Sequence, residues 1–291
     1  KKKIMEIVTK IAPIALALIM LGLGLSLTFN DFLRVFKNPK DFAIGLIGQL
    51  ILLPVIAFII IKLLNIAPDL AVGVMIIAAA PGGVTSNVLT KFANGDVALS
   101  VSLTAIISLI SVLSLPFIVF TAANILEASF ISKEISMIGI SLKMFLVVTA
   151  PVLIGMIIRK KSNDFIKNKT NLINKVSVLL FVIVFASIYI SEWANIIPFF
   201  KKAGLIALIL NITMMIVGYY FAKFFIKGMA QQKCISLECG LQNGTLAVFV
   251  ATQISVDFID SLSPLIMPTA AYSLIMLITS VIFVFIIKNK N

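Results

Sequence analysis

The feature that most constrains this fold is a succession of hydrophobic segments, each about 20 residues long. A helix of that length crosses the hydrocarbon core of a bilayer. The chain is 60% hydrophobic, above the roughly 45–50% typical of soluble domains. It is therefore predicted to be an all-α polytopic membrane protein embedded in the lipid bilayer. The predicted transmembrane spans are residues 8–28, 42–64, 70–92, 97–122, 135–158, 172–191, 203–226, 230–253 and 262–287.

Two of these nine spans are interrupted by glycine and polar residues. The third contains Pro81–Asn87 (PGGVTSN) and the eighth contains Glu238–Gly244 (ECGLQNG). Glycine can leave the helical conformation and free carbonyl oxygens from the helical ladder. The half-helix that begins at Val84 would point its N–H groups and positive dipole end at the midplane, where an anionic group could bind. Two broken helices in corresponding places are typical of a transporter's binding site.

The order of the spans predicts an inverted repeat. Spans one to four pair with spans six to nine at an offset of five, which leaves span five unpaired. Partners at an odd offset have opposite orientations in the membrane. A short connection with an acidic residue follows each broken span, Asp96 in one half and Asp257 in the other.

The distribution of basic residues predicts the orientation. The net charge of +12 is spread between hydrophobic spans, so the positive-inside rule explains it better than nucleic-acid binding. The richer side should be cytoplasmic, which puts the C-terminus inside and the N-terminus outside the cell (inner) membrane. That side includes the only long connection, residues 159–171. The richer side holds Arg34, Lys37, Lys40, Lys91, Arg159, Lys160, Lys161, Lys167, Lys169, Lys175, Lys223, Lys227, Lys233, Lys288 and Lys290, and the other Lys1, Lys2, Lys3, Lys10, Lys62, Lys133, Lys201 and Lys202.

Composition argues against an enzyme or a receptor. The chain has no histidine, no visible nucleophile–base pair and no hydrophilic domain, and no cofactor is expected. Cys234 and Cys239 are interpreted as small apolar fillers rather than reactive thiols or disulfide partners. An anion channel is an alternative, although no ring of like charges is visible in the spans.

Polar residues within the spans divide into structural and functional candidates. Ser102, Ser108, Ser111 and Ser114 are expected to bond back to helix carbonyls. Ser86, Asn87, Ser100 and Thr104 are functional candidates, because a helix break lies beside them. Gln49 by itself reads as interhelical glue more often than as a ligand. Glu238 is the strongest candidate, since intramembrane carboxylates mark ion or substrate paths; the alternative is a structural carboxyl, protonated or paired with Lys143.

The chain resembles the bile acid:sodium symporter family over essentially its whole length. The resemblance is most specific at residues 81–87, 95–102 and 238–243. It implies two sodium ions and no other metal. The implied first site uses Ser86, Asn87, Ser100, Thr104 and Glu238. The second uses the side chains of Gln49, Glu238 and Gln242 with the carbonyls of Cys239 and Leu241, and substrate would contact Val84, Thr85, Asn243 and Ser273.

The resemblance also implies a core that carries the ions and a panel that faces it. The panel would comprise residues 1–41 and 131–200, and the core residues 42–130 and 201–291. The expected function is sodium-coupled uptake of an organic anion, such as a bile acid or a small carboxylate, by alternating access. The alternative within transport is a proton-coupled or efflux carrier of related architecture. A monomer is expected.

Overall fold

The computed structural model describes residues 2–128, 136–191, 197, 200–254 and 264–289. Within these residues the regular structure is helical, apart from one isolated β-bridge between Gly82 and Gln242. Three short π-helices are labelled η. The elements are α1 (Lys2–Ser26), α2 (Phe29–Lys37), α3 (Pro39–Ile47), η1 (Gly48–Leu52), α4 (Leu53–Leu63), α5 (Pro68–Ala79), α6 (Val84–Phe92), α7 (Val97–Ile125), α8 (Met137–Met144), η2 (Phe145–Thr149), α9 (Ala150–Lys161), α10 (Asn163–Ser191), η4 (Phe200–Gly204), α12 (Leu205–Phe225), α13 (Met229–Gly240), α14 (Gly244–Ile254) and α15 (Ile266–Ile287).

The hydrophobic segments predicted from the sequence coincide with these helices over their described residues. By length and composition, five helical stretches of the described chain can cross a membrane, and further apolar helices are shorter. The five are Pro39–Leu63, Val97–Ile125, Met137–Lys161, Leu205–Phe225 and Ile266–Ile287; the shorter ones are Ala12–Ser26, Pro68–Ala79, Lys175–Ile190 and Gly244–Ile254.

The prediction of a long connection over residues 159–171 is wrong. Helix α9 continues to Lys161 and α10 begins at Asn163, so Ser162 alone separates them. Hydropathy detects only the apolar part of a helix. Charged residues with good helix propensity, such as lysine, extend it beyond the apolar stretch.

Side-chain burial follows the pattern expected in lipid. Large apolar side chains lie on the outside, with Leu113, Phe224 and Phe285 exposed by 71%, 82% and 75%. Polar side chains lie inside, and Gln49 and Glu238 are 1% and 0% exposed. Lipid solvates apolar side chains, whereas polar groups in a bilayer must find partners within the protein. The molecule is a polytopic membrane protein.

Two π-helical turns occur where a proline follows within the same helical stretch. Pro54 lies two residues after η1, and Pro151 lies two residues after η2. A proline ring clashes with the carbonyl of residue i−4 and donates no N–H, which favours a locally wider turn. The first of these turns contains Gln49. Such bulges often occur at functional sites.

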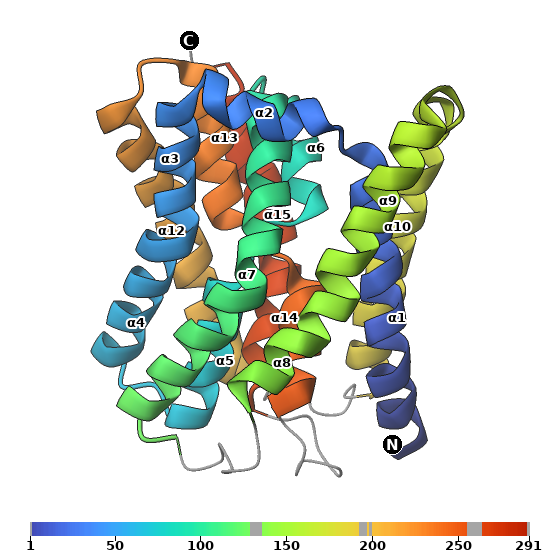
Figure 1. The fold of residues 1–291 in the computed structure, drawn as a ribbon. Coiled ribbons are helices and arrows are strands. Elements are labelled where there is room, and N and C mark those ends of the chain that lie inside the picture. Colours follow the sequence, from blue (N-terminus) through green and yellow to red (C-terminus); the bar gives the residue numbers. More distant parts are fainter. Residues whose placement is uncertain (1, 129–135, 192–196, 198–199, 255–263, 290–291) are drawn as a thin grey trace.

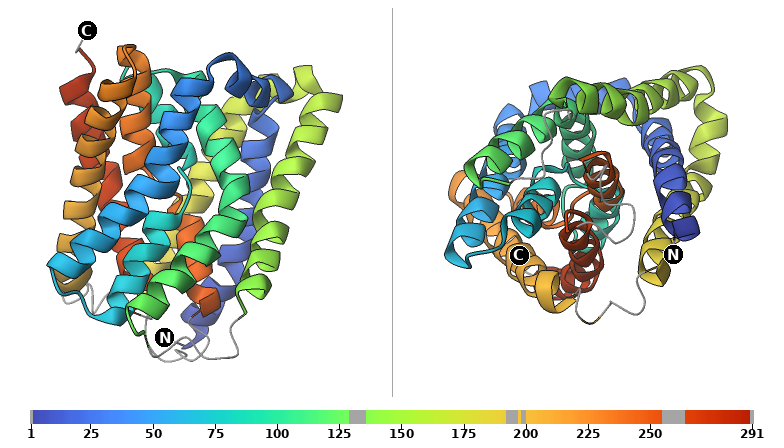
Figure 2. Two further views of the ribbon diagram at one scale, coloured as in Figure 1. Left: turned by 60° about the vertical axis from the view of Figure 1, so that its left-hand side comes forward. Right: turned by 90° about the horizontal axis from the view of Figure 1, so that it is seen from below.

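Helices α1, α9 and α10 stand side by side at one side of the bundle (Figures 1 and 2). The broken helices α5–α6 and α13–α14 lie with α7, α12 and α15 in the rest of it. Helix α2 runs across one end of the bundle and connects α1 to α3 (Figure 1). The chain therefore passes from one group of helices to the other through α2.

The two helix breaks pair with each other at the middle of the bundle. The N–H of Gly83 donates to the carbonyl of Leu241 at 3.1 Å, and the N–H of Asn243 donates to the carbonyl of Pro81 at 2.7 Å. Each broken helix thus supplies backbone partners that the other has lost. Because unpaired backbone groups are costly in an apolar interior, this pairing fixes where the helices cross.

Candidate functional site

The centre of the site is the carboxylate of Glu238, in the last turn of α13. Its Oε1 accepts hydrogen bonds from Ser86 Oγ and Ser100 Oγ, both at 2.5 Å, and lies 3.1 Å from Thr104 Oγ1. Its Oε2 accepts from Gln49 Nε2 at 2.9 Å and lies 3.1 Å from Thr104 Oγ1. These residues come from η1, α6, α7 and α13, so four segments far apart in sequence meet at one buried carboxylate.

Around Glu238 Oε1 there are more oxygen atoms that can accept a hydrogen bond than hydroxyl protons that can be donated to them. Ser86 Oγ lies 2.6 Å from the Gly83 carbonyl and 2.5 Å from the carboxylate. Ser100 Oγ lies 2.8 Å from Asn87 Oδ1 and 2.5 Å from the same carboxylate oxygen. A hydroxyl has one proton, so each serine can donate to only one of its two acceptors. A buried cluster of oxygens with too few protons suits a hard cation.

The five residues predicted from the resemblance for the first sodium site are therefore brought together. Ser86, Ser100 and Thr104 contact Glu238 directly, and Asn87 joins through Ser100. Three of the four serines expected to be structural behave as predicted, but the prediction is wrong for Ser114, whose Oγ is buried and has no hydrogen-bond partner among the described residues. Ser102, Ser108 and Ser111 donate to the carbonyls of Ala98, Thr104 and Ser108.

The second predicted group surrounds Gln49. This side chain joins the two breaks, since Nε2 donates to Glu238 Oε2 and Oε1 accepts from the Gly82 N–H at 3.3 Å. Gln242 Nε2 donates to the Cys239 carbonyl at 3.0 Å. Gln242 Oε1 is buried and has no hydrogen-bond partner in the described chain. A buried acceptor without a donor is destabilising unless a cation or water binds it.

Position 82 requires glycine because the backbone there lies against the carboxylate of Glu238. A Cβ atom there would overlap Glu238 Oε2. The glycines of the described chain all have negative φ, and Gly83 is extended, with φ −96° and ψ 160°, so the chain leaves the helical conformation at the first break as predicted. Gly82 lets the backbone of the first break touch the carboxylate of the second.

A further polar group supports the second break, and the sequence-based prediction missed it. The carbonyl of Gly240, at the end of α13, accepts from Asn211 Nδ2 at 2.7 Å and from the Tyr272 hydroxyl at 2.9 Å. Thr279 Oγ1 in turn donates to Asn211 Oδ1. An asparagine amid the apolar residues of α12 was the available signal, since buried amides in membrane helices need partners.

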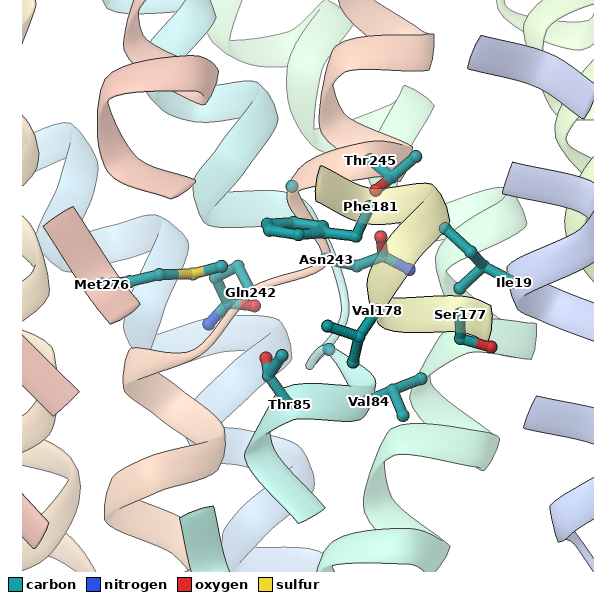
Figure 3. A pocket seen from close by; sticks show the side chains of 12 residues that line it. Ile19, Val84, Thr85, Ser177, Val178, Phe181, Gln242, Asn243, Thr245 and Met276 are labelled. Carbon is teal, nitrogen blue, oxygen red and sulfur yellow. The ribbon is translucent and has the colours of Figure 1, made fainter. Parts of the chain in front are cut away.

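A pocket of about 50 Å³ lies between the crossing and helices α1 and α10 (Figure 3). Thr85, Val84 and Asn243, three of the four predicted substrate residues, line it. The lining among the described residues is Ile19, Gly83, Val84, Thr85, Ser177, Val178, Phe181, Gln242, Asn243, Gly244, Thr245 and Met276. The side chains from α1 and α10 had not been predicted, because nothing in the sequence of an apolar helix shows which of its faces lines a cavity.

Two helix N-termini meet at this pocket. Helix α6 begins at Val84 and α14 begins at Gly244, and both residues are in the lining. Asn243 caps α14, since its Oδ1 accepts from the Leu246 N–H at 3.0 Å. Leading N–H groups and the helix dipole favour negative charge at a helix N-terminus. The pocket therefore combines apolar walls with two positively polarised backbone ends.

Three other predictions have different outcomes. Ser273 is not part of the pocket lining: its hydroxyl donates to the Thr269 carbonyl, and its side chain packs against Gly244 so closely that a Cβ there would overlap it. Pairing of Glu238 with Lys143, the structural alternative, is wrong. Lys143 Nζ donates to Gln253 Oε1 at 2.8 Å, on the exterior of the bundle. The acidic residue at 257 lies outside the described residues, whereas Asp96 caps α7.

Comparison with known proteins shows which family this chain belongs to. Residues 13–199 match the Sodium Bile acid symporter family. The chain is 30% identical over 240 residues to the probable sodium/metabolite cotransporter BASS1, chloroplastic, of Arabidopsis thaliana, covering 82% of this chain and 58% of that protein. This chain thus spans little more than half of that relative's length.

The match with this chain covers a larger share of the length of two further relatives. The uncharacterized sodium-dependent transporter YocS of Bacillus subtilis is 28% identical over 242 residues, which is 82% of this chain and 73% of that protein. The human ileal sodium/bile acid cotransporter is 28% identical over 246 residues, which is 82% of this chain and 68% of that protein. This chain belongs to the sodium bile acid symporter family.

Proposed function

We propose that this protein is a sodium-coupled secondary transporter that takes up an organic anion. The observation that carries the proposal is the buried Glu238 carboxylate, where oxygens from both broken helices converge and outnumber the available protons. Relatives named as sodium-dependent transporters or sodium cotransporters support the choice of sodium as the ion.

Two sodium ions would share the single carboxylate. The first would lie among Ser86, Asn87, Ser100, Thr104 and Glu238. The second would lie between Gln49 and Gln242, where the unpartnered Oε1 of Gln242 supplies one ligand and the carbonyls of Cys239 and Leu241 supply others. The Leu241 carbonyl already accepts the Gly83 N–H, but a carbonyl has a second lone pair.

The substrate would be an organic anion bound in the pocket between the crossing and helices α1 and α10. Two sodium ions beside one carboxylate leave a net positive charge, and the N-termini of α6 and α14 add to it. Thr85 and Asn243 would contact the anionic group. Val178, Phe181 and Met276 would contact the apolar body of a bile acid or a smaller carboxylate. Ser273 would act through Gly244, against which it packs, rather than by touching the substrate.

Alternating access would follow from movement of two helix groups. In this proposal nine helical segments cross the membrane as an inverted repeat, with α5–α6 and α13–α14 as the broken partners. The core comprises residues 42–130 and 201–291, and the panel comprises residues 1–41 and 131–200. Sodium holds the crossing in the form that binds the anion, so each ligand strengthens the other. The core then moves against the panel and exposes the pocket to alternate sides.

Sodium dependence tests the proposal through Glu238. A ligand that binds only the folded protein stabilises it by about 2.7 kcal/mol at one hundred times its dissociation constant. Sodium should raise the melting temperature of the wild-type protein well above the effect of potassium, and a sodium gradient should drive anion uptake into proteoliposomes. Glu238→Gln keeps the size of the side chain and removes its charge, and it should abolish both effects.

Two results would contradict the sodium mechanism. The first is a Glu238→Gln variant that keeps its sodium-dependent melting shift and its uptake. The second is wild-type uptake that follows a proton gradient and ignores sodium, which would favour the proton-coupled carrier.

A further inference from the structure

A second pocket lies between the α1–α2 elbow and the last turn of α9. These elements meet at the end of the bundle that α2 crosses (Figure 1). The pocket has a volume of about 310 Å³. It shares no lining residue with the pocket at the crossing. Its lining is Leu27, Thr28, Phe29, Asn30, Met156, Arg159 and Lys160.

The guanidinium of Arg159 is the unusual group in this pocket. Its Nε and Nη1 atoms are buried and have no hydrogen-bond partner among the described residues. Arginine remains charged at any physiological pH, and a buried charge without a partner is destabilising. The guanidinium is a planar fork of N–H donors that matches the oxygens of a phosphate or carboxylate. An oxyanion in the pocket would satisfy both buried nitrogens.

The neighbouring groups leave the pocket positively charged. Lys160 Nζ lies 5.6 Å from the centroid of the Phe29 ring, which holds a second cation at the rim. The carboxylate of Asp31, on the same elbow, accepts from the N–H and hydroxyl of Thr28 at 2.7 and 2.8 Å. That carboxylate caps α2 instead of pairing with Arg159. Two cations therefore line the pocket, and none of the lining residues that the structure describes is acidic.

The location of the pocket indicates where its ligand comes from. Arg159 and Lys160 lie in the last turn of the membrane-span candidate Met137–Lys161. Helix α2 crosses the end of the bundle and exposes Phe29 and Leu33 by 61% and 52%. A helix that lies along the end of a membrane bundle with exposed apolar side chains is typical of the bilayer interface. Lipid phosphates lie at this depth, and basic pockets beside membrane helices bind anionic headgroups.

We propose that this pocket binds the phosphate of an anionic phospholipid, with Arg159 as its bidentate ligand and Lys160 as a second cation. The lipid would contact the elbow through which the chain passes from α1 to the remaining helices. Helix α2 also contacts α7, because Ser102 Oγ lies 2.8 Å from the Asp31 carbonyl as well as from the Ala98 carbonyl. Bound lipid would therefore brace α9 against an element that contacts α7.

The test compares three charge-removing variants in the intact protein. Arg159→Gln and Lys160→Gln remove the two pocket cations. Lys161→Gln is the matched control, since it removes the next positive charge, which is exposed and outside the lining. Each protein is mixed with phosphatidylglycerol and phosphatidylcholine, and native mass spectrometry measures the lipid retained. Wild type and Lys161→Gln should retain phosphatidylglycerol preferentially, and Arg159→Gln should bind it roughly tenfold more weakly.

Folding and the identity of the anion are controlled separately. Arg159→Lys keeps the positive charge but lacks the planar guanidinium. It should bind phosphatidylglycerol better than Arg159→Gln does, and a folding defect would not explain that difference. If Arg159→Gln does not fold, Lys160→Gln provides the test and should bind the lipid severalfold more weakly than Lys161→Gln does. Equal retention in wild type, Arg159→Gln and Lys160→Gln would overturn the proposal. Arg159-dependent thermal stabilisation by inorganic phosphate, with no preference for phosphatidylglycerol, would overturn the lipid as the source and identify a free oxyanion.

Discussion

At the scale of single residues, two serines of α7 have different proposed roles. Ser100 is a proposed sodium ligand, and Ser108 is a structural group. Both are buried, but Ser100 Oγ contacts Glu238 and Asn87, whereas Ser108 Oγ donates to the carbonyl of Thr104, in the preceding turn. Ser100→Ala should weaken the apparent sodium affinity roughly tenfold, since a charge-assisted contact contributes about 1.5–3 kcal/mol. Ser108→Ala should leave it unchanged. Sodium titration followed by melting temperature measures both.

The same pair shows what sequence can reveal about a residue. The break at residues 81–87 distinguished Ser100 from Ser108, because a neighbouring interruption is a local signal. Asn211 gave a weaker signal, and its role at the second break was not predicted. The alternative that Glu238 pairs with Lys143 was wrong. Which polar groups meet depends on how helices pack, and a single sequence does not encode that in any local pattern. If Ser108→Ala weakens sodium affinity as much as Ser100→Ala does, this distinction between the two residues is mistaken.

At the scale of elements, the crossing depends on the contact of Gly82 with Glu238. A methyl group at position 82 would overlap the carboxylate and force the two broken helices apart. Gly82→Ala should destabilise the protein by about 1–3 kcal/mol, the usual cost of overpacking, and should remove the sodium-dependent rise in melting temperature. Gly139→Ala is the matched control, because a Cβ there meets Ser136 Cβ at an ordinary 3.5 Å. Equal behaviour of the two variants would show that the crossing tolerates a side chain.

Helix positions were largely predictable, since a 20-residue apolar run has few alternatives in a membrane. The ends of the helices were less predictable. A long connection was expected over residues 159–171, but only Ser162 separates α9 from α10. The breaks were predicted from glycine leaving the helical conformation, as Gly83 does, but the contact between Gly82 and Glu238 was not predicted. Glycine permits close approach at position 82, and the pairing of the two breaks through Gly83 and Asn243 supplies the backbone partners. That pairing joins segments about 160 residues apart in sequence, so no local pattern contains it.

At the scale of the whole molecule, the proposed transport mechanism requires that the two helix groups move relative to each other. Lys143 on α8 and Gln253 on α14 meet across the proposed boundary between panel and core, with Nζ 2.8 Å from Oε1. In a background without Cys234 and Cys239, cysteines at positions 143 and 253 can be joined by a short cleavable cross-linker. Cross-linking should abolish sodium-driven uptake, because the panel can no longer move against the core.

Binding should survive the same cross-link, since neither position contributes to the oxygen cluster at Glu238 or to the lining of the pocket at the crossing. Sodium should therefore still raise the melting temperature of the cross-linked protein, and cleavage of the linker should restore uptake. Single-cysteine variants treated in the same way should transport normally and thereby exclude chemical damage. Uptake that persists in fully cross-linked protein would mean that α8 and α14 move together, and the boundary between the moving parts would then have to lie elsewhere.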